Sequence, residues 1–206
     1  MKRGSWLLLA LAVTALAGAC TSADIGPEYV EVSEQESELQ FYGPGLAGGY
    51  RLFLAGQDSQ FVHRTFATYG PSVGEFPFAR MYFSETPPTR YFARVSAVEK
   101  TIEHWAWFDS KTIKFGASGT AVNAIGRIDF VTATADGVAC VVWLQTFGPR
   151  EGTGVGTRLL NGYYCRGRGP MISSAEAESI VLLVGHRKYG AVDPPKSWPA
   201  AASPAL

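Results

Sequence analysis

Apolar and polar positions alternate along three stretches in the first half of the chain. The ranges 50–54, 61–68 and 78–84 are rich in aromatic and branched residues, and Gly, Asp and Pro separate them. Alternation with a period of two places every second side chain on the same face of an extended strand. We therefore expect three neighbouring antiparallel strands that form a meander.

A second set of extended segments follows in the second half of the chain. The ranges 125–134, 138–147 and 159–165 are alternating or continuously apolar, and the dipeptide Asp136-Gly137 joins the first two. Asp-Gly is typical of two-residue β-hairpin turns, because both of its residues tolerate positive φ. Together the extended segments predict an antiparallel sheet of six or seven strands.

Two segments have helical spacing instead. Over 90–108, apolar residues recur at intervals of four and three, which predicts one helix with a face packed on the sheet. Over roughly 173–187, Ser173 and Glu176 form the capping-box pattern of a helix start. The predicted fold is therefore α+β: a single domain whose antiparallel β-sheet meander packs against one central helix and a short C-terminal helix. A lipocalin-like or sandwich-like all-β fold is the alternative if the start of 90–108 is extended.

The second set of segments also carries two of the three cysteines. Cys140 lies in the range 138–147 and Cys165 in the range 159–165, so an antiparallel pairing can place their sulfur atoms opposite each other. We expect a disulfide between them. The glycine string 152–156 in the connector has a GxGxG spacing, but it leads into a strand and not into a helix. A flexible hairpin loop is therefore favoured over a phosphate-binding loop.

The first twenty residues have the three parts of an export signal. Lys2 and Arg3 precede an uncharged run over 6–16, and small residues follow up to Cys20. The apolar run is too short to span a membrane as a helix. The signal 1–19 is expected to be absent from the mature chain.

The end of this signal, Leu16-Ala17-Gly18-Ala19-Cys20, resembles the lipobox of bacterial lipoproteins. The resemblance covers only residues 1–20, and Ala17 stands where the family prefers leucine. It implies that Cys20 becomes the lipidated first residue of the mature protein, which then contacts the membrane through its lipid. Since Thr21 and not Asp follows the cysteine, the resemblance further implies an outer-membrane lipoprotein of the bacterial cell envelope, facing the periplasm or the surface.

Composition divides the rest of the chain into three parts. The range 20–48 is acidic and is expected to be a flexible tether. The range 49–190 is the predicted globular α+β domain. The range 191–206 is rich in Pro and Ala, which indicates a disordered tail.

The charge balance argues against nucleic-acid binding. Of the 18 basic residues, Lys2 and Arg3 leave with the signal, so 16 remain against 18 acidic ones. The resulting formal charge of −2 provides no basic excess to neutralise phosphates. A nucleic-acid partner is therefore not expected.

Few residues offer catalytic chemistry. The three histidines have no metal-ligand spacing, and no nucleophile elbow is present. Glu99 and Glu103 share a face of the predicted helix, where solvent exposure is a simpler explanation than a catalytic pair. We expect no catalytic residue, no metal and no cofactor, and an enzyme is the less favoured class.

Two hypotheses about function remain. In the first, the protein is an envelope-anchored lipoprotein with a non-enzymatic binding or structural role, and its partner is another envelope protein. In the second, it is a periplasmic hydrolase or a small-ligand-binding protein whose site is assembled from dispersed residues. The candidate residues for such a site are His63, Glu103, His104 and Arg127.

Overall fold

The computed structural model describes residues 29–46, 50–58, 60, 62–71, 75–92, 97–149 and 156–195. Three predictions fall outside these residues: the signal 1–19, the lipidated Cys20, and most of the glycine string, 152–155. None of the helices in the described part of the chain has the length and apolar character needed to cross a membrane.

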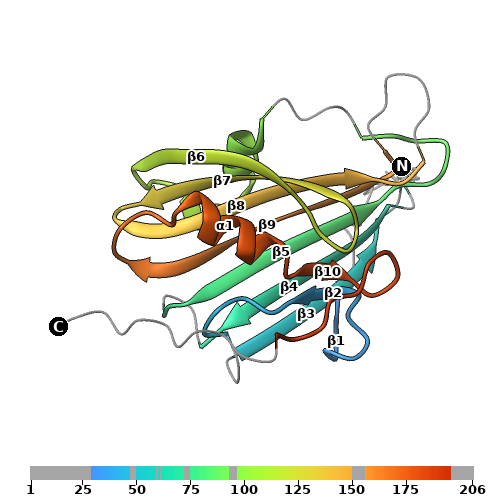
Figure 1. Cartoon of the computed structure of the whole chain (residues 1–206). Helices are drawn as coiled ribbons and strands as arrows, with labels where there is room; N and C mark the ends of the chain where they lie inside the picture. Colours follow the sequence, from blue (N-terminus) through green and yellow to red (C-terminus); the bar gives the residue numbers. More distant parts are fainter. Residues whose placement is uncertain are drawn as a thin grey trace, which may run out of the picture.

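The described strands form two antiparallel sheets (Figure 1). The large sheet has eight strands in the order β1-β3-β4-β5-β9-β8-β7-β6, and the small sheet pairs β2 with β10. In chain order the strands are β1 (Val30–Val32), β2 (Leu39–Phe41), β3 (Tyr50–Gln57), β4 (His63–Gly70), β5 (Phe78–Glu85), β6 (Ile113–Val122), β7 (Arg127–Ala135), β8 (Val138–Phe147), β9 (Arg158–Arg168) and β10 (Val184–His186).

Two groups of strands that follow the chain order make up the large sheet. Strands β3, β4 and β5 pair with one another in sequence, and so do β6, β7, β8 and β9. The two groups meet where β5 pairs with β9. The sheet is therefore not one continuous meander. Its antiparallel character and its α+β class agree with the sequence-based prediction.

The Asp136-Gly137 turn joins β7 to β8 as predicted. Both residues have positive φ, 50° at Asp136 and 80° at Gly137, which is the geometry of a two-residue hairpin turn. By contrast, β6 was not among the predicted strands, and it contains two glycines, Gly116 and Gly119. Gly119 faces Phe130 of β7 across the ladder, and a Cβ there would lie 2.5 Å from the Phe130 ring. The glycine is thus a packing requirement within a strand.

The long helix predicted over 90–108 is wrong. The described part of this range contains two short 3₁₀ helices, η1 (Val98–His104) and η2 (Ala106–Phe108). Before them the backbone N–H of Phe92 donates to the carbonyl of Gly156 at 3.0 Å, so the chain leaving β5 is attached to the start of β9. The β-branched residues of η1 also favour a long helix less than unbranched ones do. The apolar spacing reflected burial against the sheet, not a continuous helix.

The C-terminal helix is present but shorter than predicted. It is α1 (Ser174–Val181), and the Ser173 hydroxyl accepts a hydrogen bond from the Glu176 backbone N–H at 3.2 Å. The Glu176 carboxylate, however, accepts from Arg166 of β9 at 2.7 Å, which ties the helix start to the large sheet. The helix ends before 187 because the chain extends into β10, which needs the exposed edge of β2 as its partner.

The predicted tether 20–48 is wrong for its described part, residues 29–46. β1 pairs with β3, and β2 pairs with β10. Leu39 and Phe41 of β2 are only 1% and 2% exposed. The same range contains the buried apolar residues Leu39, Phe41 and Leu46, so a high charge did not mean a solvated segment. Of the predicted tail, residues 191–195 form no helix or strand, and 196–206 lie outside the description.

The large sheet is covered on both faces. On one face, α1 and the β2–β10 pair pack on Trp143, Phe83, Tyr164 and other residues of the sheet. On the other face, Trp105 and the two 3₁₀ helices pack on Tyr163 and the disulfide. Figure 1 shows α1, β2 and β10 on the near side of the sheet and the 3₁₀ segment behind it. Two hydrophobic cores therefore share one sheet.

The predicted disulfide lies at the centre of the sheet. Cys140 of β8 and Cys165 of β9 are directly paired across the ladder, and their sulfur atoms are bonded. Both residues are completely buried, beneath the 3₁₀ helices. The bond therefore joins two neighbouring interior strands of the sheet at a position that is fully buried.

Removing the disulfide is expected to lower the free energy of unfolding by about 3 kcal/mol, because it closes a loop in the unfolded chain. The two cysteines are 25 residues apart in sequence. Urea denaturation of the double variant Cys140→Ala/Cys165→Ala, beside the oxidised wild type, measures this loss. An intact mass that does not rise by two hydrogens on reduction would contradict the bond.

Candidate functional site

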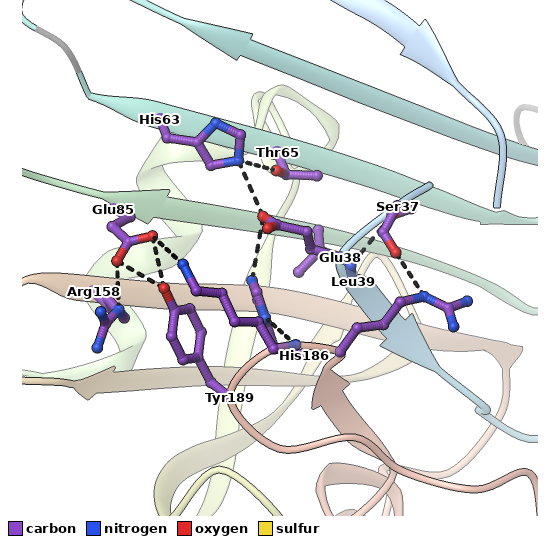
Figure 2. Close-up of polar contacts among 11 residues, drawn as sticks. Ser37, Glu38, Leu39, His63, Thr65, Glu85, Arg158, His186 and Tyr189 are labelled. Carbon is purple, nitrogen blue, oxygen red and sulfur yellow. Dashed lines mark hydrogen bonds and ion pairs between the residues drawn. The ribbon is translucent and has the colours of Figure 1, made fainter. Parts of the chain in front are cut away.

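A network of ionisable side chains lies where β2, β4 and β10 come together (Figure 2). At its centre is Glu38, which directly precedes β2. Its Oε2 atom lies 3.1 Å from Nε2 of His63, at the start of β4, and 3.6 Å from Nε2 of His186, at the end of β10. The first distance is a hydrogen bond, and the second is slightly longer than one. One carboxylate oxygen thus serves two imidazoles.

The His186 ring is completely buried, and its surroundings determine its tautomer. Its Nδ1 atom accepts a hydrogen bond from the backbone N–H of Lys188 at 3.3 Å. In the neutral ring the proton is therefore on Nε2, which faces Glu38. The rings of Phe83 and Tyr189 pack against the imidazole, with centroids 4.3 and 4.7 Å away. These contacts allow the ring little freedom to turn away from the carboxylate.

Glu38 and His63 favour each other's charged form. The neighbouring imidazoles of His186 and His63 hold the pKa of Glu38 well below its ordinary value. The hydrogen bond to Glu38 raises the pKa of His63 above its ordinary value, against the opposing effect of burial. Glu85 adds to this rise and Lys188 opposes it. Both residues of the pair remain more than a third exposed, so water screens their interaction.

A second carboxylate extends the network. Glu85, the last residue of β5, accepts hydrogen bonds from the Tyr189 hydroxyl at 2.8 Å and from Arg158 Nε at 2.7 Å. Burial would raise the pKa of Glu85, but these two hydrogen bonds and the nearby positive charges lower it. The Arg158 guanidinium also lies over the Tyr189 ring, 4.0 Å from its centroid. The segment after β10 is thus fixed to the ends of β5 and β9.

The network can hold a proton, but it lacks a reactive partner. The hydroxyl nearest to His63 belongs to Thr65, at 3.2 Å, and Thr65 is only 1% exposed. Among the described residues, no group of three or more His, Cys, Asp or Glu side chains is arranged to hold a metal ion. The arrangement therefore fastens the β2–β10 layer to the large sheet through interactions that depend on pH.

A pocket of about 400 Å³ lies on the opposite face of the sheet, between the 3₁₀ helices and the strands. Its wall is mostly apolar. The apolar and aromatic residues that line it are Phe66, Tyr82, Phe92, Trp105, Leu144 and Leu159. The volume and the lining are both typical of small-molecule sites.

Several polar groups also line the pocket. They belong to Tyr29, Arg64, Thr101, His104 and Asn161. Three buried polar atoms of lining residues have no hydrogen-bond partner among the described residues: Arg64 Nε, Trp105 Nε1 and Asn161 Oδ1. Trp105 and Asn161 are only 8% and 7% exposed. A buried polar atom without a partner costs about 1–3 kcal/mol, and three of the seven such atoms among the described residues belong to side chains that line this pocket.

The structure separates the four candidate residues named from the sequence. His63 belongs to the network of Glu38, whereas His104 is exposed at the pocket on the other face. Glu103 is exposed on η1. Arg127 starts β7 and pairs with Asp129 at 3.1 Å on the surface. No single cleft therefore contains all four.

Sequence reasoning missed the other members of both sites. Glu38, Glu85 and His186 are far apart in the chain, and no local spacing connects them. One signal was available, however. His63 and Arg64 are consecutive in a predicted strand, so alternation places their side chains on opposite faces of the sheet. This alternation indicates that His63 and Arg64 belong to different sites, one on each face of the sheet.

Comparisons with protein-family models, with curated proteins and with solved structures gave no match. The pocket and the network are therefore the observations on which a functional proposal rests.

The Glu38–His63 pair predicts a maximum of stability at mildly acidic pH. The raised pKa of His63 stabilises the fold below pH 6.5, and this contribution is lost as the pH rises through the raised value. The lowered pKa of Glu38 stabilises the fold above pH 4.5, and this contribution is lost as the pH falls. Both contributions are present in the window between these values.

Urea denaturation at about pH 5.5 and about pH 8.5 measures the His63 contribution. From the lower to the higher pH, we expect the free energy of unfolding of the wild type to fall by up to about 1 kcal/mol more than that of His63→Gln. The difference is modest because solvent screens the pair. Arg127→Gln, which alters an exposed ion pair away from the network, is the control and should behave as the wild type. Equal losses in the wild type and His63→Gln would contradict the assignment.

Proposed function

We propose that the protein is an envelope-anchored lipoprotein with a non-enzymatic role in binding a small ligand. Lipidated Cys20 attaches it to the outer membrane of the bacterial cell envelope, and its folded domain faces the periplasm or the surface. The lipobox-like residues before Cys20 support the anchor. The buried bond between Cys140 and Cys165 supports an exported location, because disulfides persist in oxidising compartments.

The pocket between the 3₁₀ helices and the sheet is the observation that carries the binding role. Its size is sufficient for a small organic molecule, and its wall combines apolar surface with a few polar groups. A core that only stabilised the fold would favour close packing at this position. Here the packing stops short, and Trp105 and Asn161 present unpartnered polar atoms at the same place.

The lining residues favour binding over catalysis. Of the titratable side chains of this lining, His104 is exposed, and Arg64 is paired with Asp58 at 2.9 Å. Arg64 also has a side-chain hydrogen bond with Tyr29, and neither of its contacts joins a nucleophile to a base. Hydrogen bonding and apolar contact are the interactions that this pocket offers to a ligand.

The anchor is tested by metabolic labelling with palmitate and by fractionation of the envelope. We expect the wild type to incorporate the label and to sediment with membranes. The Cys20→Ser variant should not incorporate the label and should not be held at the membrane by a lipid. Ser22→Ala, two positions away, is the matched control and should be labelled normally. Incorporation of label by Cys20→Ser would contradict lipidation at this residue.

Binding is tested with N-phenylnaphthylamine, an uncharged dye that fluoresces in apolar surroundings. The wild type should bind it, and Leu144→Trp, which fills the pocket from β8, should bind it at least about tenfold more weakly. Val122→Trp is the matched control, because Val122 is 73% exposed on β6. Circular dichroism confirms that both variants are folded. Equal binding by Leu144→Trp and the wild type would contradict the pocket as the site.

A further inference from the structure

The chemistry of the pocket lining identifies a class of ligand, an inference that rests on the proposed binding function. The apolar wall accommodates an aliphatic or aromatic body. Its largest members are the rings of Phe66, Tyr82 and Trp105, and Phe66 and Tyr82 pack with centroids 4.7 Å apart. Aromatic walls of this kind bind apolar groups through contact area, without demanding hydrogen bonds from them.

The ionisable side chains of the lining, tyrosines apart, are all basic. Its charged or ionisable residues other than tyrosine are Arg64 and His104, and no Asp or Glu is among the described residues that line the pocket. Asp58, the ion-pair partner of Arg64, is not part of the lining either. A ligand in the pocket can therefore contact Arg64 and His104, whereas Asp58 lies outside the lining.

The unpartnered donor atoms also favour an anionic group on the ligand. Arg64 Nε and Trp105 Nε1 are donors only, so a hydrogen-bond partner for either atom has to be an acceptor. Asn161 does not distinguish an anionic from a cationic head group, since its amide has both an acceptor oxygen and a donor nitrogen. A charged acceptor makes stronger hydrogen bonds to such donors than a neutral one.

We infer that the pocket binds a small amphipathic carboxylate, an apolar chain or ring with one anionic head group. The head group lies toward Arg64, where the guanidinium offers a donor that Asp58 does not use. The body of the ligand lies along the aromatic wall beneath the 3₁₀ helices. The lining supplies no partner of opposite charge for a cationic head group.

Three probes of equal chain length test the head group: decanoate, decanol and decylamine. They are titrated calorimetrically, below their micelle concentrations, into the full chain carrying Cys20→Ser, so that no lipid competes. Decanoate should bind about tenfold more tightly than decanol, as expected for a charge-assisted hydrogen bond, and decylamine most weakly. Arg64→Gln should weaken the binding of decanoate much more than that of decanol, and so remove the preference for decanoate.

Two controls keep the outcomes apart. Arg127→Gln removes an exposed guanidinium outside the pocket and should retain the preference for decanoate. Thermal melting of Arg64→Gln shows whether losing the ion pair with Asp58 has unfolded the protein, and retained binding of the uncharged dye by this variant is the second check. Equal affinity for all three probes would overturn the anionic head group and leave the binding function standing. No binding of any probe or of the uncharged dye would overturn the binding function itself.

Discussion

The interior strands β8 and β9 are buried on both faces, and this requirement organises the rest of the molecule. Residues from Val138 to Leu144 are all buried, whichever face their side chains point to. A sheet in this condition needs two covering layers. The chain supplies one from its two ends, through β2, α1 and β10, and the other from the segment between β5 and β6. The disulfide lies under the second layer and joins the strands that are most deeply enclosed.

Both sites lie away from the fully packed centre of these layers. On one face, β2 and β10 end at the network of Glu38, where ionisable groups take the place of apolar packing. On the other face, η1 and Trp105 cover the sheet incompletely and leave the pocket. The short 3₁₀ helices matter here, because a long helix over 90–108 would lie against more of the sheet. The observed segment of short helices is thus the part of the chain that borders the pocket.

The two sites share strands but not faces. Consecutive residues of β4 serve them separately, since His63 contacts Glu38 and Arg64 lines the pocket. Glu85 and Tyr82 of β5 divide in the same way. A shift of β4 or β5 would therefore alter both the network of Glu38 and the pocket. The network also fastens the two ends of the folded domain to each other, because Glu38 and His186 are neighbours in space and far apart in the chain.

What the sequence alone determined were the features that depend on neighbouring residues. The Asp136-Gly137 turn, the start of α1 at Ser173 and most of the strands follow from local backbone preferences and from alternation. The disulfide followed as well, because a connector between two strands limits which residues can be opposite each other. The α+β class with an antiparallel sheet could be predicted on the same basis.

Only the tertiary structure decided which distant segments meet. The pairing of β5 with β9 and of β2 with β10 joins parts of the chain whose local patterns contain no information about each other. The acidic range around Glu38 looked like a solvated tether for this reason. Its charges are visible in the sequence, whereas the partners that bury its apolar residues come from distant strands: Phe41, for example, packs on Tyr69, Trp143 and Tyr164. The pocket likewise depends on where packing stops, which is a property of assembled layers and of no single segment.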